Sequence, residues 1–317
     1  MKDICSILNI KYPILQGAMG HITDGAFAAK VANAGGLGVI ATADESMDFV
    51  REQYRIAKSM TNGTIGLNIP FRKSLTDELA QFVIDEGVEV VVASAGSPKA
   101  YIPGWKEHGV KIISVVAVVE HAIKMDAAGV DIIVAEGMES GGRIGKMTTM
   151  SLIPQVVDAV SCPVVAAGGI ADGRGMAAAF ALGASGVQIG TRFMFAEESP
   201  IHDNFRQAIL KAKSSDVVVS GRFYRIGAEA RIIRNQLFEK SIELEKAGAS
   251  DEEYEKLFKG AMARAIVDGD VENGSPMVGQ IVGMLNKTET VQGIIDDLVA
   301  DYNAQPLLEK IKPYVKK

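Results

Sequence analysis

Eight short apolar runs recur along the first part of this chain, and a longer segment of helical period follows most of them. The runs are rich in Val and Ile, are bounded by glycine and alternate little with polar residues. This pattern is typical of strands that are buried on both faces of a parallel sheet. The runs lie at residues 13–16, 37–41, 65–69, 89–93, 111–116, 131–135, 163–167 and 186–189.

Helical segments between these runs extend the pattern. Strand alternating with helix predicts right-handed βαβ units. Eight such units in about 210 residues predict a (β/α)8 TIM barrel. A doubly wound open sheet is the alternative, but no GxGxxG fingerprint follows the first run. The expected helices include 24–34, 46–60, 75–86, 120–128, 151–160 and 173–182.

The pattern changes after about residue 205, where we expect a C-terminal helical appendage. We assign 1–212 to the barrel, 213–225 to a connection and 226–317 to the appendage. A flap over the active face and a structural or dimerisation lobe are both compatible with this segment. The helices expected after the barrel are 228–246, 251–267, 277–285 and 290–301.

Composition narrows the class of protein. The 317 residues are 48% hydrophobic and 23% charged, which is a soluble globular composition and not a disordered one. The net charge of −6 disfavours nonspecific nucleic-acid binding. Two cysteines suit a reducing cytosol and suggest neither a disulfide framework nor a metal cluster. The charged N-terminal stretch is unlike a signal peptide, and we expect no membrane span and a cytoplasmic location.

The loops that follow the strands carry the expected chemistry, because a TIM barrel places its active site at the carboxyl ends of its strands. A loop dense in glycine, 135–149, follows the sixth strand. Loops 166–173 and 190–192 follow the seventh and eighth strands, where this fold commonly binds phosphate through backbone N–H groups. The alternative is that their glycines only form tight turns.

Several motifs together resemble one family. The segments KYPILQGAM, AGGLGVI, GLNIP, AEGMESGG, AAGGIADG and QIGTRF are similar to the FMN-dependent nitronate monooxygenase family. Three others, GKMTTM at 145–150, RNQL at 234–237 and GSPMVGQ at 274–280, resemble its branch of flavin-type enoyl-acyl-carrier-protein reductases. The resemblance implies a TIM barrel with FMN on the carboxyl-terminal face. It implies that FMN contacts Gly17, Ala18, Met19, Asn68, Glu136, Gly142, Gly168, Gly169, Gly190 and Thr191, with the phosphate at the last four.

The resemblance also implies a reaction. In the reductase branch, NADH or NADPH reduces the flavin, which then transfers hydride to the β-carbon of a thioester-conjugated alkene, and the substrate carrier can be acyl carrier protein. The nitronate monooxygenases instead oxidise a nitronate with oxygen. We therefore expect an FMN-dependent oxidoreductase, most simply an enoyl-thioester reductase that forms a homodimer, with nitronate oxidation as the alternative.

One residue departs from both branches, because Arg143 stands where they typically have histidine. Histidine exchanges a proton near neutral pH, whereas arginine stays charged and cannot act as an ordinary acid or base. Arg143 can stabilise an enolate electrostatically, bind an anionic substrate, or be a solvated side chain of a protein that binds flavin without turnover.

Two further predictions concern the catalytic face. His21 follows the first strand, and we hypothesise that it is a relocated proton donor and, with Arg143, a catalytic residue. Alternatively, His21 caps the next helix or stacks near the flavin. Arg222, Tyr224 and Arg225 are candidates to line a substrate entrance.

Overall fold

The computed structural model describes residues 3–43, 45–71, 75–220 and 229–305. Eight parallel strands form one sheet in the order β1-β9-β8-β6-β5-β4-β3-β2, and a parallel bridge from Leu15 to Leu37 joins its edges. This closure confirms the predicted (β/α)8 TIM barrel. The strands are β1 (Ile14–Gln16), β2 (Gly38–Ile40), β3 (Ile65–Pro70), β4 (Val90–Ser94), β5 (Lys111–Val116), β6 (Ile132–Glu136), β8 (Val164–Ala167) and β9 (Gly186–Ile189).

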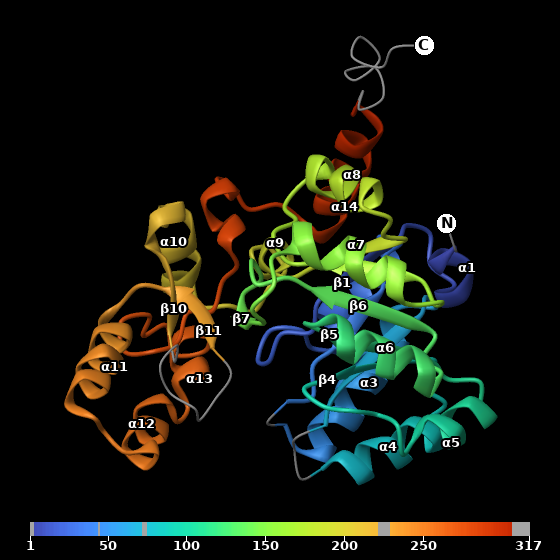
Figure 1. Cartoon of the computed structure of the whole chain (residues 1–317), viewed down its shortest axis with the longest axis horizontal. Helices are drawn as coiled ribbons and strands as arrows, with labels where there is room; N and C mark the ends of the chain where they lie inside the picture. The colour runs from blue at the N-terminus through green and yellow to red at the C-terminus, as the bar shows by residue number, and fades with distance from the viewer. Residues whose placement is uncertain (1–2, 44, 72–74, 221–228, 306–317) are drawn as a thin grey trace.

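Helices cover the outside of the barrel, and each helix predicted between its strands is present to within about two residues at either end. Of the helices predicted after the barrel, 251–267 is divided into two helices and 277–285 is a short 3-10 helix. Figure 1 shows them to the right of the picture, around the strands. They are α2 (Gly25–Asn33), α3 (Met47–Met60), α4 (Thr76–Asp85), α5 (Ile102–Glu107), α6 (Val119–Ala128), α7 (Thr149–Ala159) and α8 (Gly173–Ala181).

A short N-terminal helix, α1 (Ile4–Leu8), joins the apolar core inside the barrel. Ile4 and Leu8 are buried together with strand residues such as Leu15 and Val39. Burial of such a side chain contributes about 1.5–3 kcal/mol, so α1 stabilises the barrel. The interior of the barrel is therefore a packed core.

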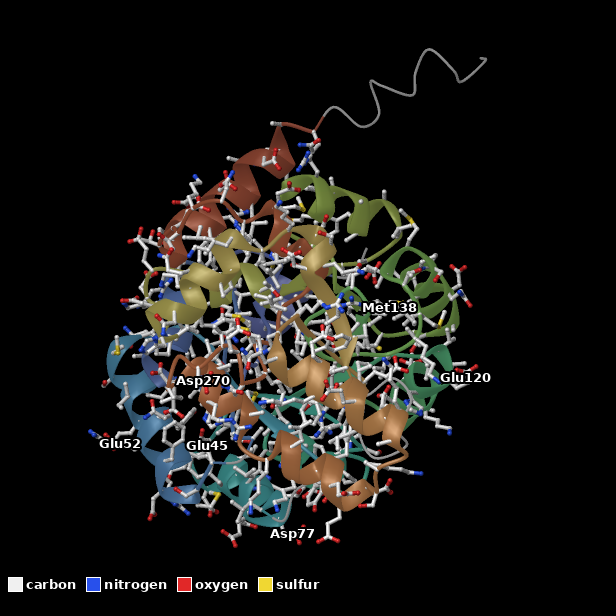
Figure 2. The ribbon with its side chains drawn as sticks, turned by 90° about the vertical axis from the view of Figure 1, so that its left-hand side faces the viewer. Glu45, Glu52, Asp77, Glu120, Met138 and Asp270 are labelled. Carbon is white, nitrogen blue, oxygen red and sulfur yellow. The ribbon has the colours of Figure 1, made fainter. Side chains whose placement is uncertain are left out.

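The chain leaves the barrel after β9 and forms a second lobe, drawn in yellow and orange at the left of Figure 1. Figure 2, turned by 90°, shows this lobe in front of the barrel. A short helix, α9 (Thr191–Met194), connects β9 to this lobe at the centre of Figure 1. The elements of the lobe are α10 (Asp203–Lys211), η1 (Ser214–Asp216), β10 (Val217–Ser220), β11 (Ala230–Ile233), α11 (Gln236–Ala247), α12 (Asp251–Phe258), α13 (Ala261–Ile266) and η2 (Gln280–Met284).

The helix predicted from residue 228 is wrong at its start. Ala230–Ile233 form β11, which pairs antiparallel with β10 on one side and with β7 (Gly142–Arg143) on the other. Helix α11 begins only after Asn235, whose side chain accepts a hydrogen bond from the Phe238 N–H. Pairing with distant strands overrides a local pattern that fits either structure.

The last helix, α14 (Val291–Asn303), packs back on the barrel against α2 and α8. Figure 1 shows it in red beside α8. Ile294, Ile295 and Leu298 are buried in the same core as the outer barrel helices. Helix α14 therefore covers the barrel wall, and the division into a barrel of 1–212 and an appendage of 226–317 stays a prediction. The predicted entrance residues Arg222, Tyr224 and Arg225 lie outside the described residues.

No helix in the described ranges has both the length and the apolar character needed to cross a bilayer. Within the same ranges, His, Cys, Asp and Glu side chains form no group of three or more suited to a metal ion.

Candidate cofactor site and active site

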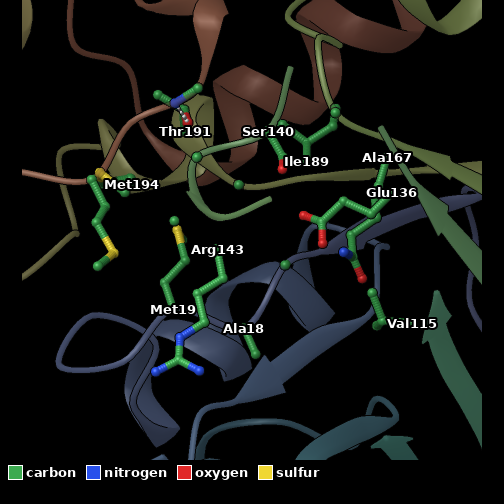
Figure 3. Close-up of a pocket in the computed structure, with 18 of the residues that line it drawn as sticks. Ala18, Met19, Val115, Glu136, Ser140, Arg143, Ala167, Ile189, Thr191 and Met194 are labelled. Atoms are coloured by element: carbon green, nitrogen blue, oxygen red, sulfur yellow. Dashed lines mark hydrogen bonds between the residues drawn. The ribbon is translucent and has the colours of Figure 1, made fainter. Parts of the chain in front are cut away.

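A cavity of about 270 Å³ opens at the carboxyl ends of the barrel strands, beneath the second lobe. Every predicted cofactor-binding residue lines it, and so does Arg143, while His21 is not among the lining residues. Figure 3 shows part of the wall, with Ala18 and Met19 from the loop after β1. The predicted residues at the wall are Gly17, Ala18, Met19, Asn68, Glu136, Gly142, Arg143, Gly168, Gly169, Gly190 and Thr191.

Gly17 and Gly190 line the cavity at positions where the backbone conformation would also allow other residues. A Cβ on Gly190 would meet only the Met19 sulfur, at 3.7 Å, and one on Gly17 would meet only the Gln188 side chain, from 3.6 Å. Neither has a positive φ, so neither backbone nor packing demands glycine. Their missing side chains leave a cradle in which a large ligand can touch the backbone, which fits the FMN that the motifs imply.

The loop after β8 needs its glycines for its own conformation. Gly168 and Gly169 have φ of 91° and 77°, in the left-handed region. A Cβ on Gly168 would lie 2.6 Å from the Gly137 carbonyl oxygen, so two glycine loops touch there. The glycines of this loop are therefore needed for its tight turn, and the loop can also bind a ligand through its backbone.

Backbone N–H groups point to an anion site at these loops. In the part of the chain that the structure describes, the N–H groups of Gly169 and Gly190 donate to no protein acceptor. The Thr191 hydroxyl accepts from the Gly279 N–H at 2.8 Å, which fixes its side chain. Free N–H groups in adjacent loops suit a phosphate.

Asn68 lies on the floor of the cavity, near the end of β3. Its Nδ2 donates to the Val92 carbonyl at 2.9 Å and to the Ser94 hydroxyl at 3.0 Å. These two bonds fix the orientation of the amide and leave its oxygen as the acceptor for a ligand.

Glu136 ends β6 at the cavity wall, opposite Ala167 of β8. Burial raises the pKa of Glu136 to about 7, and the nearby Ser140 hydroxyl lowers that pKa only in part. The Ser140 hydroxyl is itself buried and falls short of hydrogen-bond geometry with any described residue. Glu136 is therefore a carboxyl group whose charge changes near neutral pH.

The glycine loop after β6 is held by residues that the sequence analysis did not single out. The Glu139 carboxylate accepts from the N–H and hydroxyl of Thr149, at 2.9 and 3.0 Å. Arg231 of β11 is 3% exposed and donates to the Met138 carbonyl at 2.7 and 3.2 Å. Burial lowers the pKa of Arg231, and the Glu139 carboxylate raises it. No local pattern marks Arg231, because its role depends on where β11 lies in the fold.

Arg143 lies in β7, where its backbone pairs with Ala230. Its side chain is exposed at the mouth of the cavity, and Figure 3 shows the guanidinium near Ala18, directed away from Glu136. Among the described residues, no carboxylate lies within ion-pair distance of Arg143. A cation placed in this way can bind an anionic part of a substrate.

The geometry around His21 differs from that of a residue facing the cavity. Its Nδ1 lies 3.4 Å from the Glu45 carboxylate, and its φ of 61° is in the left-handed region. The cap of α2 is Asp24, whose carboxylate accepts from the Phe27 N–H at 2.8 Å. The proton-donor role of His21 stays a prediction, one that this placement does not favour.

The second lobe supplies the outer wall of the cavity, which the sequence analysis did not identify residue by residue. The lobe residues that line it are mostly apolar, and two of them belong to the segment 274–280. Together with Met19 of the loop after β1 and Met194 of α9 they form an apolar ceiling over the glycine cradle. These lobe residues are Met262, Ile266, Met277, Gly279 and Ile281.

A barrel with a backbone cradle, free N–H groups after its last two strands and an apolar ceiling defines a flavin-type oxidoreductase. The family model for nitronate monooxygenase matches residues 2–82 and 76–301 of this chain. The chain therefore belongs to the nitronate monooxygenase family, which confirms the resemblance in the motifs. It is an oxidoreductase of the FMN-dependent type, as the sequence predicts.

Relatives of known name support this assignment. The chain is similar to FabK from Thermotoga maritima, with 40% identity and a TM-score of 0.93 over 99% of this chain and 100% of that one. A probable nitronate monooxygenase of Staphylococcus saprophyticus is 34% identical, over 75% of this chain and 79% of the relative. An octahydro-indene carboxyl-CoA dehydrogenase of Rhodococcus jostii is 30% identical, over 94% of both.

Proposed function

We propose that this protein reduces the double bond of an enoyl thioester, with NADH or NADPH as reductant and FMN as cofactor. The observation that carries the proposal is the place of the 274–280 segment. This segment resembles the enoyl reductase branch, and the structure puts its Met277 and Gly279 at the cavity wall. The likeness to FabK over the whole chain supports the same branch.

The residues of the chain have separate roles in this proposal. Gly168, Gly169, Gly190 and Thr191 would hold the FMN phosphate through their N–H groups, and Asn68 and Glu136 would orient the rest of the cofactor. When bound, FMN supplies the hydride chemistry. The apolar ceiling, which includes Met262 and Ile281, would exclude water and contact an apolar acyl chain.

Arg143 gives the thioester a polar contact in this proposal. Its guanidinium at the mouth would hold a phosphate or carboxylate of the substrate carrier, or stabilise the enolate that forms when the β-carbon accepts hydride. The Rhodococcus relative is named for a carboxyl-CoA compound, which supports a thioester substrate. Acyl carrier protein and coenzyme A are the two carriers to compare.

Anaerobic mixing tests the proposal directly. We expect a yellow purified protein whose flavin absorbance bleaches with NADH or NADPH and returns when an enoyl thioester is added. Failure of the thioester to reoxidise the reduced flavin would overturn the proposal. Comparing crotonyl-coenzyme A with crotonyl-acyl carrier protein then identifies the preferred carrier.

Nitronate oxidation is the second candidate function, favoured by the family model and the staphylococcal relative. Bleaching by a nitronate without nicotinamide, followed by turnover with oxygen, would select it. Steady-state turnover of either kind excludes the third candidate, a protein that binds flavin without catalysis.

We also propose a cytoplasmic homodimer. The low cysteine count supports the reducing compartment. Light scattering after size exclusion tests the dimer, and a mass near 33.7 kDa, that of one chain, would contradict it.

A further inference from the structure

Glu136 is a carboxyl group in the cavity wall without a cation to balance it. It is the last residue of β6, and Figure 3 shows its carboxyl group pointing into the cavity. The two strands that pair with β6 present uncharged residues, Ala167 from β8 and Val115 from β5. Asn68 of β3, farther along the same wall, is also uncharged. These neighbours are uncharged, so the strands beside Glu136 supply no compensating charge.

The loop after β6 carries the charged groups nearest to Glu136 along the cavity wall. Glu139 is bound to Thr149 and carries the same sign of charge. The Arg143 guanidinium is directed away, toward the mouth. No ion pair within the described ranges includes Glu136. An uncompensated carboxylate in such a site favours its neutral form.

A second polar group, the Ser140 hydroxyl, lies beside Glu136 and acts on its carboxyl group. Ser140 is 9% exposed, and within the described part of the chain its hydroxyl makes no hydrogen bond. Figure 3 shows Ser140 and Glu136 on the same side of the cavity. Buried polar groups are nearly always hydrogen-bonded, so the Ser140 hydroxyl beside Glu136 indicates a place for a polar ligand. A neutral carboxylic acid can donate to such a ligand, whereas a carboxylate can only accept.

We propose that Glu136 binds FMN as a neutral carboxylic acid and donates a hydrogen bond to it, so that FMN binding is linked to a proton. This inference rests on the cofactor of the proposed function and not on its substrate. If only the neutral acid binds FMN well, FMN affinity is independent of this group below its pKa. Above that pKa the dissociation constant rises, by up to about tenfold per pH unit.

Titration of the apoprotein with FMN, followed by quenching of flavin fluorescence between pH 6 and 9, tests the linkage. For the natural chain we expect the dissociation constant to rise above about pH 7. Glu136→Gln keeps a neutral hydrogen-bond donor at every pH. Once the ionisation of FMN itself has been corrected for, the dissociation constant of this variant for FMN should not change with pH. The matched control is Glu120→Gln, an exposed glutamate of α6 at the edge of Figure 2, which should behave like the natural chain.

The same pH dependence in Glu136→Gln as in the natural chain would overturn the proposal, and so would a flat natural profile. If the variant fails to fold, calorimetry of FMN binding to the natural chain at pH 8 in two buffers measures the protons taken up. Uptake approaching one proton is expected, and zero uptake overturns the proposal. Both readouts are independent of turnover, so failure of the enoyl reductase proposal is seen separately.

Discussion

Arg192 joins three parts of the chain behind the expected phosphate loops, and its removal should weaken the fold. One guanidinium nitrogen donates to the Ala171 carbonyl at 2.8 Å, in the loop after β8. The other donates to Asp297 of α14 at 2.6 Å and to Glu289 at 3.1 Å. The Arg192 side chain is 8% exposed, so these are largely desolvated, charge-assisted contacts.

The size of the expected loss in unfolding free energy follows from how deeply the partners of Arg192 are buried. Removing one member of a buried ion pair costs about 3–5 kcal/mol, because the other member keeps its charge. Asp297 is 51% exposed and can be solvated again, while Glu289 is 18% exposed and retains Lys287 at 3.0 Å. We therefore expect Arg192→Met to lower the free energy of unfolding by about 3 kcal/mol, the low end of that range.

Urea denaturation of the apoprotein measures this change as a shift in midpoint at constant slope. Arg174→Met is the control, because Arg174 also pairs with an aspartate, Asp172, but is 67% exposed. An exposed pair contributes about 0–1 kcal/mol. Equal losses in the two variants would refute the view that the Arg192 contacts are buried and stabilising. FMN affinity should fall in Arg192→Met as well, since the Ala171 loop loses an anchor.

Three further predictions concern the cavity wall. Gly190→Ala should reduce FMN affinity at least about tenfold while changing stability by less than about 0.5 kcal/mol, because its Cβ would project into the cavity and make only an ordinary contact with the Met19 sulfur; an unchanged dissociation constant would contradict this. Gly168→Ala should cost about 1–3 kcal/mol in urea unfolding, because of its φ of 91° and the Gly137 carbonyl. Between the ordinary pKa of 4.5 and about 7, native Glu136 holds more protons than the unfolded chain, so stability falls as pH rises. Between pH 5 and 8 the free energy of unfolding of the natural apoprotein should fall by up to about 3 kcal/mol more than that of Glu136→Gln. If the two proteins lose stability in parallel over this range, the raised pKa of Glu136 is excluded.

The barrel was predictable from the sequence because each buried parallel strand is a local apolar run, which a single stretch of chain reveals. Strand β11 was not, because the short run Ala230–Ile233 fits a helix equally well and becomes a strand through pairing with β7 and β10. The packing of α14 on α2 and α8 was missed for the same reason, since an amphipathic helix does not specify its partner.

In the candidate site, too, local features were predictable from the sequence, and features that depend on distant segments were not. The glycine loops could be placed because a barrel rule assigns them to one face, and all of them line the cavity. The roles of Arg231 and the ceiling residue Met262 depend on how the second lobe folds over that face, which no local pattern encodes. The left-handed backbone of His21 and its place beside Glu45 were not predictable from spacing, and its role as a proton donor stays a prediction.

The return of α14 also sets the order in which the barrel is completed during synthesis. The chain finishes its last barrel strand, β9, at Ile189, but the helix that covers α2 and α8 starts only at Val291. At about 5–20 residues per second, roughly 5–20 s separate the two events on the ribosome. Throughout that interval the apolar flank of α2 and α8 stays uncovered. The second lobe therefore delays closure of the barrel wall, and nascent chains stopped before α14 should bind chaperones or aggregate.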